Sequence, residues 1–303
     1  MTQSRFIEPG ATYAITRRVE GRRFLLRPDA MLTQLFTWLL CVMAARFEIQ
    51  VHVAVVMSTH YHLVVTDPHG RVSKFAHGLN VCLSKSVKVM RRFVRGVVWE
   101  PGGLSVVALV TREAVVESIA YAIANPVAAG LVTDPAHWPG LTASVEDLGQ
   151  RMLEATRPAF FFRPKKWLAH ATLKLVLPAC LLELGLETAR ALVQAELEHQ
   201  LEKARGAVKA EGWRVLGPVA ARNVSPYAEA TSWRDLGSLN PHVKAGRGQT
   251  EARMNALARR AVFLSDYASA LARWCGGDRE VVFPAGTYWM RVHHGAAMAA
   301  FDT

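Results

Sequence analysis

The first half of the chain alternates between two hydrophobic periods, one of two residues and one near 3.6 residues. Strand patterns cover four short segments, 11–16, 47–57, 61–66 and 104–110. Apolar and polar positions alternate in the first, and the last is an apolar run suited to a buried strand. Helical spacing covers three longer segments: 30–46, 70–95 and 111–125, the last one preceding Pro126. The resulting order β, α, β, β, α, β, α predicts an α+β fold in which helices pack on an antiparallel sheet.

The second half of the chain follows a different pattern and is predicted to be mainly helical. Helical spacing covers two segments there, 171–210 and 250–275. Residues 281–294 fit either a short strand or a docking tail. We therefore expect two domains, 1–150 and 151–303, and the sequence assigns no function to the second one.

Composition describes a folded and basic protein. Apolar residues make up 51% of the chain and charged residues 20%, which excludes a disordered chain. Lys and Arg number 36 against 25 Asp and Glu, so the formal net charge is +11. A surplus of this size favours a polyanionic partner, either nucleic acid or an acidic membrane surface, and charge alone does not decide between them.

The cysteines and the apolar segments indicate in which cellular compartment we expect the protein. The four cysteines are scattered and match no disulfide framework or zinc spacing, so we expect isolated reduced thiols. The N-terminus has no apolar signal core, and the most apolar segments, 31–45 and 173–186, are shorter than the roughly 20 residues that span a bilayer. We therefore expect a soluble cytoplasmic protein without a membrane partner.

The sharpest chemical motif is His60-Tyr61-His62 in a predicted strand. Residues two apart on a strand point to the same face, so the two imidazoles project side by side. This arrangement suits one divalent metal ion. The alternative is a pair of ordinary polar residues at the start of a strand. His52, on the preceding strand, is interpreted as structural.

A second motif lies on the last predicted helix of the first half, where Tyr121 and Asn125 are one turn apart and face the same way. A tyrosine hydroxyl can attack phosphorus and form a covalent ester, and an asparagine can offer its carbonyl oxygen to a metal. The alternative is a partly buried core tyrosine, with Asn125-Pro126 ending the helix.

Taken in order, the motifs of residues 9–145 resemble those of the HUH single-tyrosine transposases, an insertion-sequence transposase-like domain, and in particular the REP-associated tyrosine transposases. Members of that family have a Gly-x-x-Tyr start, a His-x-His-Leu strand, a Leu-Asn pair in a basic helix, a following Trp and a Tyr-x-x-x-Asn-Pro-Val helix. The matching positions are Gly10, Tyr13, Arg18, His60, His62, Leu63, Leu79, Asn80, Trp99, Tyr121, Asn125, Pro126, Val127, Ala129, Gly130, Leu131 and Val132.

The resemblance implies an HUH, ferredoxin-like nuclease core and a metal-dependent endonuclease and strand transferase that acts on single-stranded or hairpin DNA. Tyr121 would attack the scissile phosphate and give a 5′-phosphotyrosine link with a free 3′-OH. His60, His62 and Asn125 would hold Mg²⁺ or Mn²⁺. The phenol can act within its own subunit or across a homodimer.

Basic residues supply a candidate DNA surface. Residues 71–95 hold no acidic residue, and like charges along one helix are costly unless a polyanion neutralises them. A solvated basic face is the alternative. The candidate DNA contacts from this segment and from the first strand are Arg17, Arg18, Arg22, Arg23, Lys74, Lys85, Lys88, Arg91, Arg92 and Arg95. Arg163, Lys165, Lys166 and Trp167 could extend the surface.

The sequence also departs from the family pattern. Ser58-Thr59 replaces Pro-Asn before the histidines, and Ile123 stands where a histidine is usual. Glu100-Pro101-Gly102 replaces a more basic stretch. These departures leave open a second hypothesis, a domesticated protein that binds DNA hairpins or regulates without cleaving them. RNA binding by the same surface is a third.

Overall fold

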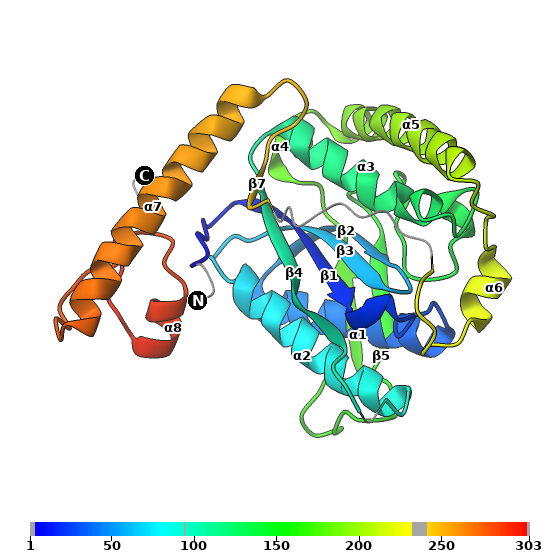
Figure 1. Cartoon of the computed structure of the whole chain (residues 1–303), viewed down its shortest axis with the longest axis horizontal. Helices are drawn as coiled ribbons and strands as arrows, with labels where there is room; N and C mark the ends of the chain where they lie inside the picture. Colours follow the sequence, from blue (N-terminus) through cyan, green and yellow to red (C-terminus); the bar gives the residue numbers. More distant parts are fainter. Residues whose placement is uncertain (1–3, 94, 232–240, 302–303) are drawn as a thin grey trace.

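The computed structural model describes residues 4–93, 95–231 and 241–301, and a five-stranded sheet lies at the centre of this part of the chain (Figure 1). Four antiparallel strands, in the spatial order β2-β3-β1-β4, are β1 (Thr12–Val19), β2 (Gln50–Val56), β3 (His60–Thr66) and β4 (Trp99–Leu109). The short strand β7 (Val243–Lys244) joins β4 in parallel. The predicted α+β class is confirmed, and the second half of the chain makes the sheet mixed.

Helices cover both faces of this sheet (Figure 1). On one face lie α1 (Ala30–Phe47) and α2 (Val72–Met90), and on the other lies α3 (Arg112–Ala128), with α5 (Leu186–Ala210) outside it. The alternation along β3 assigns the faces. Tyr61 points to α1 and α2, where its hydroxyl donates to Asn80 Oδ1 at 2.8 Å. Its neighbours His60 and His62 therefore point to α3.

Local signals set the helix boundaries. The Asp29 carboxylate accepts the Leu32 amide at 2.9 Å and caps α1, and the Thr111 hydroxyl accepts the Ala114 amide at 3.2 Å and caps α3. Pro126 lies inside α3, so the prediction that this helix ends at residue 125 is three residues short. The fixed φ of proline is helical, and its missing N–H costs the last turn one hydrogen bond without ending the helix.

The second half of the chain contains a hairpin that sequence spacing does not predict. Strands β5 (Met152–Thr156) and β6 (His170–Lys174) pair with each other and pack against α1. The helical prediction for residues 171–174 is therefore wrong. Burial alternates along β6, which fits a strand, and pairing with β5 satisfies its backbone.

Besides α5, this half contains one further long helix and several short elements. The long helix α7 (Thr250–Cys275) has the predicted bounds. Within 281–294, predicted as a short strand or a docking tail, residues 289–294 form helix α8 and Phe283 and Met290 pack with Ala270 of α7. The remaining elements are α4 (Ala179–Leu182), α6 (Pro218–Asn223) and two 3₁₀ turns, Glu20–Arg22 and Pro135–His137. The mainly helical character predicted for this region is confirmed.

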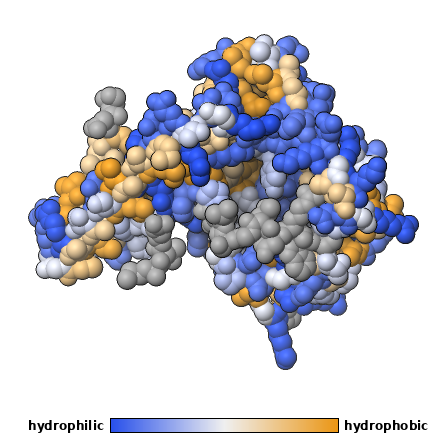
Figure 2. Space-filling model, turned by 45° about the horizontal axis from the view of Figure 1, so that its top comes forward, coloured by the Kyte–Doolittle hydropathy of each residue, from blue (hydrophilic) through white to orange (hydrophobic). Residues whose placement is uncertain are grey.

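Two apolar clusters stabilise the described residues. The larger one reaches from Ile7 to Ala221 and includes side chains of α5 and the hairpin, so residues before and after 150 share it. The smaller one joins α7 to the C-terminal segment around Phe283. Helix α7 projects to one side and mixes hydrophobic with hydrophilic residues on its surface (Figures 1 and 2). The division into two domains stays a prediction.

Helix α1 is the one helix of the described residues that is long and apolar enough to cross a membrane by length and composition. Its mean hydropathy is 1.5, and 61% of it is buried inside the structure. Phe36 and Trp38 belong to this buried part and pack against Tyr61 and Phe162. A core helix of a folded protein is mostly buried in this way and passes the same test of length and composition.

Candidate active site

Two elements bring the chemically distinctive residues together. Strand β3 supplies His60 and His62, and α3 supplies Tyr121 and Asn125. The two imidazole rings are 4.8 Å apart between centroids, and the Tyr121 ring lies 5.4 Å from that of His62. His60 Nε2 is 3.1 Å from Asn125 Oδ1. The structure thus gathers the four residues into one site, and their chemical roles stay predictions.

Two threonines fix the orientation of the imidazoles. His62 Nδ1 hydrogen-bonds to the Thr16 hydroxyl of β1 at 2.9 Å, and His60 Nδ1 to the Thr59 hydroxyl at 2.9 Å. Both Nε2 atoms are therefore directed toward the interior of the site. Sequence analysis missed the two threonines. Register could have revealed Thr16, because it lies directly opposite His62 on the adjacent strand.

Burial keeps both imidazoles neutral at neutral pH. It lowers the pKa of His60 to about 4, and the charges of Arg18 and Arg22 lower it further against the Asn125 hydrogen bond. Burial and the neighbouring His60 and Arg18 hold the pKa of His62 well below its usual range. The neutral imidazole is the form that binds a metal ion.

Tyr121 is the accessible member of the site. Its residue surface is 41% exposed, although Asn125 beneath it is buried. Desolvation raises the pKa of the Tyr121 phenol, while a hydrogen bond to Asn125 and the charge of Arg18 lower it. An exposed ring beside buried, neutral imidazoles leaves one side of the site open to an incoming group.

The residues present fit a divalent cation. His62 Nε2 is buried and has no hydrogen-bond partner within the described chain, which is costly for a polar atom unless a ligand satisfies it. No group of three or more His, Cys, Asp or Glu residues that could hold a metal occurs in residues 4–93, 95–231 and 241–301. The donors would therefore be two imidazole nitrogens and the Asn125 oxygen, a set without negative charge.

The arginines of the first strand divide between the two faces of the sheet. Arg18 pairs in register with His60 and lies 3.8 Å from the Glu100 carboxylate, at the edge of the site. Arg17 points to the opposite face, where its guanidinium lies 5.5 Å from the centre of the Trp99 ring. Arg23 forms an ion pair with Glu229 at 3.0 Å.

The basic residues of α2 lie on the sheet face opposite to the histidines. Among the predicted DNA contacts near this helix, those exposed to solvent are Lys74, Lys85, Arg92 and Arg95, and Lys88 is half-buried. Arg91 differs, since its side chain is only 7% exposed and lies 2.5 Å from the Asp29 carboxylate. Arg91 also donates to the Leu25 carbonyl at 3.2 Å, so its guanidinium is bound to partners inside the protein.

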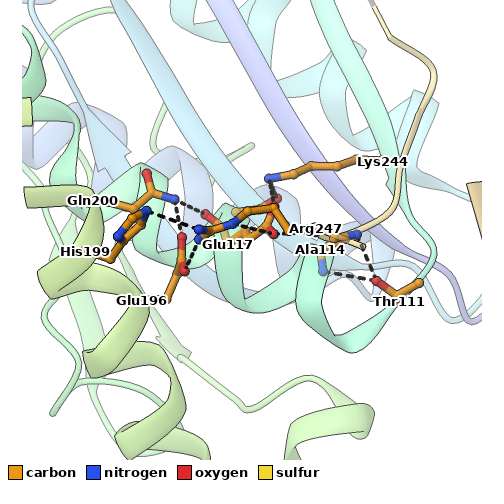
Figure 3. A network of polar contacts seen from close by, with 10 residues as sticks. Thr111, Ala114, Glu117, Glu196, His199, Gln200, Lys244 and Arg247 are labelled. Atoms are coloured by element: carbon orange, nitrogen blue, oxygen red, sulfur yellow. Dashed lines mark hydrogen bonds and ion pairs between the residues drawn. The ribbon is translucent and has the colours of Figure 1, made fainter. Parts of the chain in front are cut away.

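A polar network anchors the helix that carries Tyr121 (Figure 3). Glu117, one turn before Tyr121, lies 3.3 Å from Lys244 Nζ and accepts the Arg247 amide at 2.8 Å. The Arg247 guanidinium reaches Glu196 of α5 at 2.5 Å. Charges from β7, the following loop and α5 therefore hold α3 in place. Sequence patterns contain no signal for this network, because its partners are far apart along the chain.

Gly246 is part of the same junction. Its amide donates to the Thr111 hydroxyl at 3.1 Å, beside the start of α3. A Cβ atom at this position would collide with the Glu113 Cβ, far inside van der Waals contact. The close approach of the two backbones therefore requires glycine.

The hydrogen bonds of His52 explain its burial without a role in chemistry. His52 is buried and hydrogen-bonds to the Val176 carbonyl at 2.7 Å and the Thr66 hydroxyl at 2.8 Å, as expected of a structural residue. Ile123, which replaces the usual histidine of the family, is buried in the apolar core. It fills space between α3 and its neighbours.

Comparisons with known proteins give distant matches among solved structures. No family model matches the chain, and no curated protein matches it. A solved structure of a REP-associated tyrosine transposase bound to a REP hairpin matches 46% of this chain and 81% of its own, with 17% identity and a TM-score of 0.40. A proposed transposase from Deinococcus radiodurans R1 matches 35% of this chain and 85% of its own, with 15% identity and a TM-score of 0.28. Both matches are under 25% identical to this chain, and neither shows which residues react.

Proposed function

We propose that the protein is a divalent-metal-dependent DNA endonuclease and strand transferase that cuts single-stranded or hairpin DNA through a covalent bond to Tyr121. The observation that supports it most is the grouping of His60, His62, Asn125 and Tyr121 at one place, from a strand and a helix. The motif resemblance specifies the reaction class. The proposed setting is the cytoplasm, in a bacterial type of cell.

Tyr121 acts as the nucleophile in this proposal. Its oxygen bonds to phosphorus, and the bond from phosphorus to the 3′ oxygen breaks. The phenol loses its proton and the leaving 3′ oxygen gains one, so the products are a 5′-phosphotyrosine and a free 3′-OH. The ester keeps the energy of the phosphodiester bond, and the reverse attack by a 3′-OH joins strands without ATP.

Each neighbour of Tyr121 has a positioning role. Asn125 holds the phenol by a hydrogen bond and also faces His60. Thr16 and Thr59 keep the two imidazoles in fixed orientations. Arg18 places a positive charge beside the site, where it favours the approach of a phosphate.

His60, His62 and Asn125 would hold Mg²⁺ or Mn²⁺. A cation there polarises a bound phosphate and neutralises the charge that develops on it. Because the donors are uncharged, we expect weak binding of the cation alone and tighter binding when DNA is present. Arg22, whose charge acts on His60, and the adjacent Arg23 are proposed to contact DNA phosphates.

The decisive experiment is a search for the covalent intermediate. Incubation with a 3′-labelled DNA hairpin and Mg²⁺ or Mn²⁺ should give a labelled protein band on a denaturing gel. Tyr121→Phe should abolish the band, and EDTA should prevent it. Tyr227→Phe is the matched control, because Tyr227 is also exposed but lies outside the site, with its hydroxyl on the Arg91 carbonyl.

Two outcomes would contradict the proposal. An undiminished band with Tyr121→Phe would mean that another residue reacts. Hairpin binding that is indifferent to EDTA, without any adduct, would instead identify a DNA-binding protein that does not cleave, the alternative favoured by the departures at Ser58, Thr59 and Ile123. Competition between matched DNA and RNA hairpins distinguishes RNA binding.

A further inference from the structure

An open groove lies between α2 and the loop that joins β5 to β6, on the side of the sheet away from Tyr121. Its volume is about 290 Å³. Helix α2 contributes Val81, Cys82 and Lys85 to its lining. The loop contributes Phe161, Arg163, Lys166 and Trp167. Apolar, aromatic and cationic side chains thus meet in one hollow.

Phe161 stands out by its backbone and its exposure. Its φ is 71°, in the left-handed region that bulky residues rarely adopt, and it is 45% exposed. The next residue, Phe162, is buried and packs against Trp38 at 4.7 Å and Trp167 at 5.1 Å between ring centroids. Strain that places an aromatic ring in solvent, beside an anchored neighbour, is a feature of binding sites.

The loop that presents Phe161 is held at both ends. The Arg157 guanidinium donates to the Trp167 carbonyl at 2.5 Å, and Trp38 Nε1 donates to the Leu168 carbonyl at 3.2 Å. The Lys166 amide closes a turn onto the Arg163 carbonyl at 3.0 Å. The exposed ring is therefore carried by a supported loop.

The charges around the groove are of one sign. Lys85, Arg163 and Lys166 line it, and none of them forms an ion pair within residues 4–93, 95–231 and 241–301. No acidic residue belongs to the lining. The exposed Lys74 and Arg92 continue the positive charge along α2 and beyond its end. A polyanion is the ligand that such a surface complements.

We propose that this groove binds single-stranded nucleic acid, with a base stacked on Phe161 and the flanking phosphates beside Lys85, Arg163 and Lys166. Proteins that bind single strands combine a cationic groove with aromatic rings on which bases stack. An acidic peptide or an anionic membrane would complement the cations but would not need a strained, exposed ring. The groove is a second contact, separate from the cleavage site, and it does not depend on the reaction at Tyr121.

The test measures binding of a fluorescein-labelled oligothymidylate by anisotropy, in EDTA and with the Tyr121→Phe protein, so that cleavage does not contribute. Phe161→Leu should weaken binding about 10-fold, because the leucine keeps an apolar side chain but loses the stacking plane. Phe161→Tyr should bind like the parent protein. Lys85→Ala and Lys166→Ala should each lower the slope of log affinity against log salt by about 0.7.

Lys203→Ala is the matched control, because Lys203 is an exposed lysine on α5, across the sheet from the groove, and does not line it. It should leave the affinity for the oligonucleotide within about twofold of the parent value. Thermal unfolding of every variant shows whether the fold is kept.

A local readout comes from the cysteines. Bound oligonucleotide should slow alkylation of Cys82, which lines the groove, and leave the exposed Cys275 of α7 unchanged. The proposal would be overturned if Phe161→Leu bound the oligonucleotide as tightly as the parent protein, or if the oligonucleotide did not protect Cys82. It would also be overturned if polyglutamate or phosphatidylglycerol vesicles occupied the groove in preference to the oligonucleotide. Failure here with an intact covalent adduct at Tyr121 would leave the cleavage proposal standing.

Discussion

The two faces of the central sheet use polar residues in opposite ways. Under α3, His60, His62 and Asn125 are neutral, largely removed from water and fixed by hydrogen bonds. Beside α2, the charged side chains are mostly exposed and lie along a helix surface. Reactive groups need desolvation and a fixed orientation, whereas contacts to phosphates need accessible charge. Buried, neutral polar side chains thus gather under α3 and exposed charge gathers beside α2, while Arg18 is a charged residue next to the histidines.

Helix α2 and the segment after it show that charge along the sequence does not by itself define a binding surface. Arg91 and Arg92 are adjacent, yet Arg91 is buried against Asp29 and Arg92 is exposed. Burial alone would raise the pKa of the Asp29 carboxyl, but hydrogen bonds from the Leu32 amide and from Arg91 hold that pKa below its usual value. The first arginine stabilises the fold, and the second is accessible to a partner.

The largest effect is expected from the imidazole pair. His62→Ala should lower the affinity for Mn²⁺, measured by calorimetry in the presence of a DNA hairpin, by at least about 100-fold, because it removes one of the proposed donors. His69→Ala is the control, since His69 is exposed and pairs with Glu48 at the surface. Equal loss of affinity in both variants would contradict the assignment.

Arg91→Ala should destabilise the protein by about 3 kcal/mol in urea unfolding, because it removes the buried partner of the Asp29 carboxylate. Arg92→Ala should change the free energy of unfolding by less than about 0.5 kcal/mol. The pKa of Asp29 is lowered in the folded state, so the contribution of the pair is present above the usual value of 3.8 and declines as pH falls toward the folded pKa. A large effect of Arg92→Ala on stability would break the distinction between these neighbours.

Thr16→Val tests the orientation of His62 at nearly constant side-chain volume. Loss of the hydrogen bond to His62 Nδ1 should weaken Mn²⁺ binding about 10-fold and leave the fold intact. Thr12→Val is the control on the same strand and face, where the hydroxyl bonds to Thr66 at 2.7 Å instead. If Thr12→Val weakens Mn²⁺ binding to the same extent, the loss reflects a general disturbance of strand β1 and not the orientation of His62.

The smallest effect is expected at the junction of α3, β7 and α5. Arg247→Ala should lower the free energy of unfolding by about 1 kcal/mol, because Glu117 and Glu196 then face each other with less compensation and the guanidinium is 63% exposed. Arg253→Ala, at an exposed position of α7, should have no measurable effect. Urea unfolding of both variants distinguishes a specific junction from general surface charge.

Short-range patterns predicted much of the fold and the two residue pairs of the site, whereas the meeting of the two pairs was implied by the family resemblance. A period of two along β3 predicted that His60 and His62 share a face, and one helical turn predicted the same for Tyr121 and Asn125. The bounds of α7 followed from local sequence as well. These features depend on residues close together in the chain, where geometry is nearly fixed.

Features that depend on distant partners could not be predicted. β7 is two residues long, and the strand with which it pairs, β4, lies much earlier in the chain. β6 lies in a stretch with helical spacing and becomes a strand by pairing with β5. The burial of Arg91 depends on Asp29, which caps the N-terminus of helix α1 far earlier in the chain. Which face of the sheet α2 covers depends on tertiary packing.

The most direct measurement of the central claim is pulsed electron paramagnetic resonance of Mn²⁺ bound to the protein with a DNA hairpin. The account predicts modulation from two imidazole nitrogens, reduced to one in His60→Ala and in His62→Ala. Mn²⁺ bound without any histidine nitrogen, or with the same modulation in both variants, would contradict the claim that His60 and His62 hold the ion beside Tyr121.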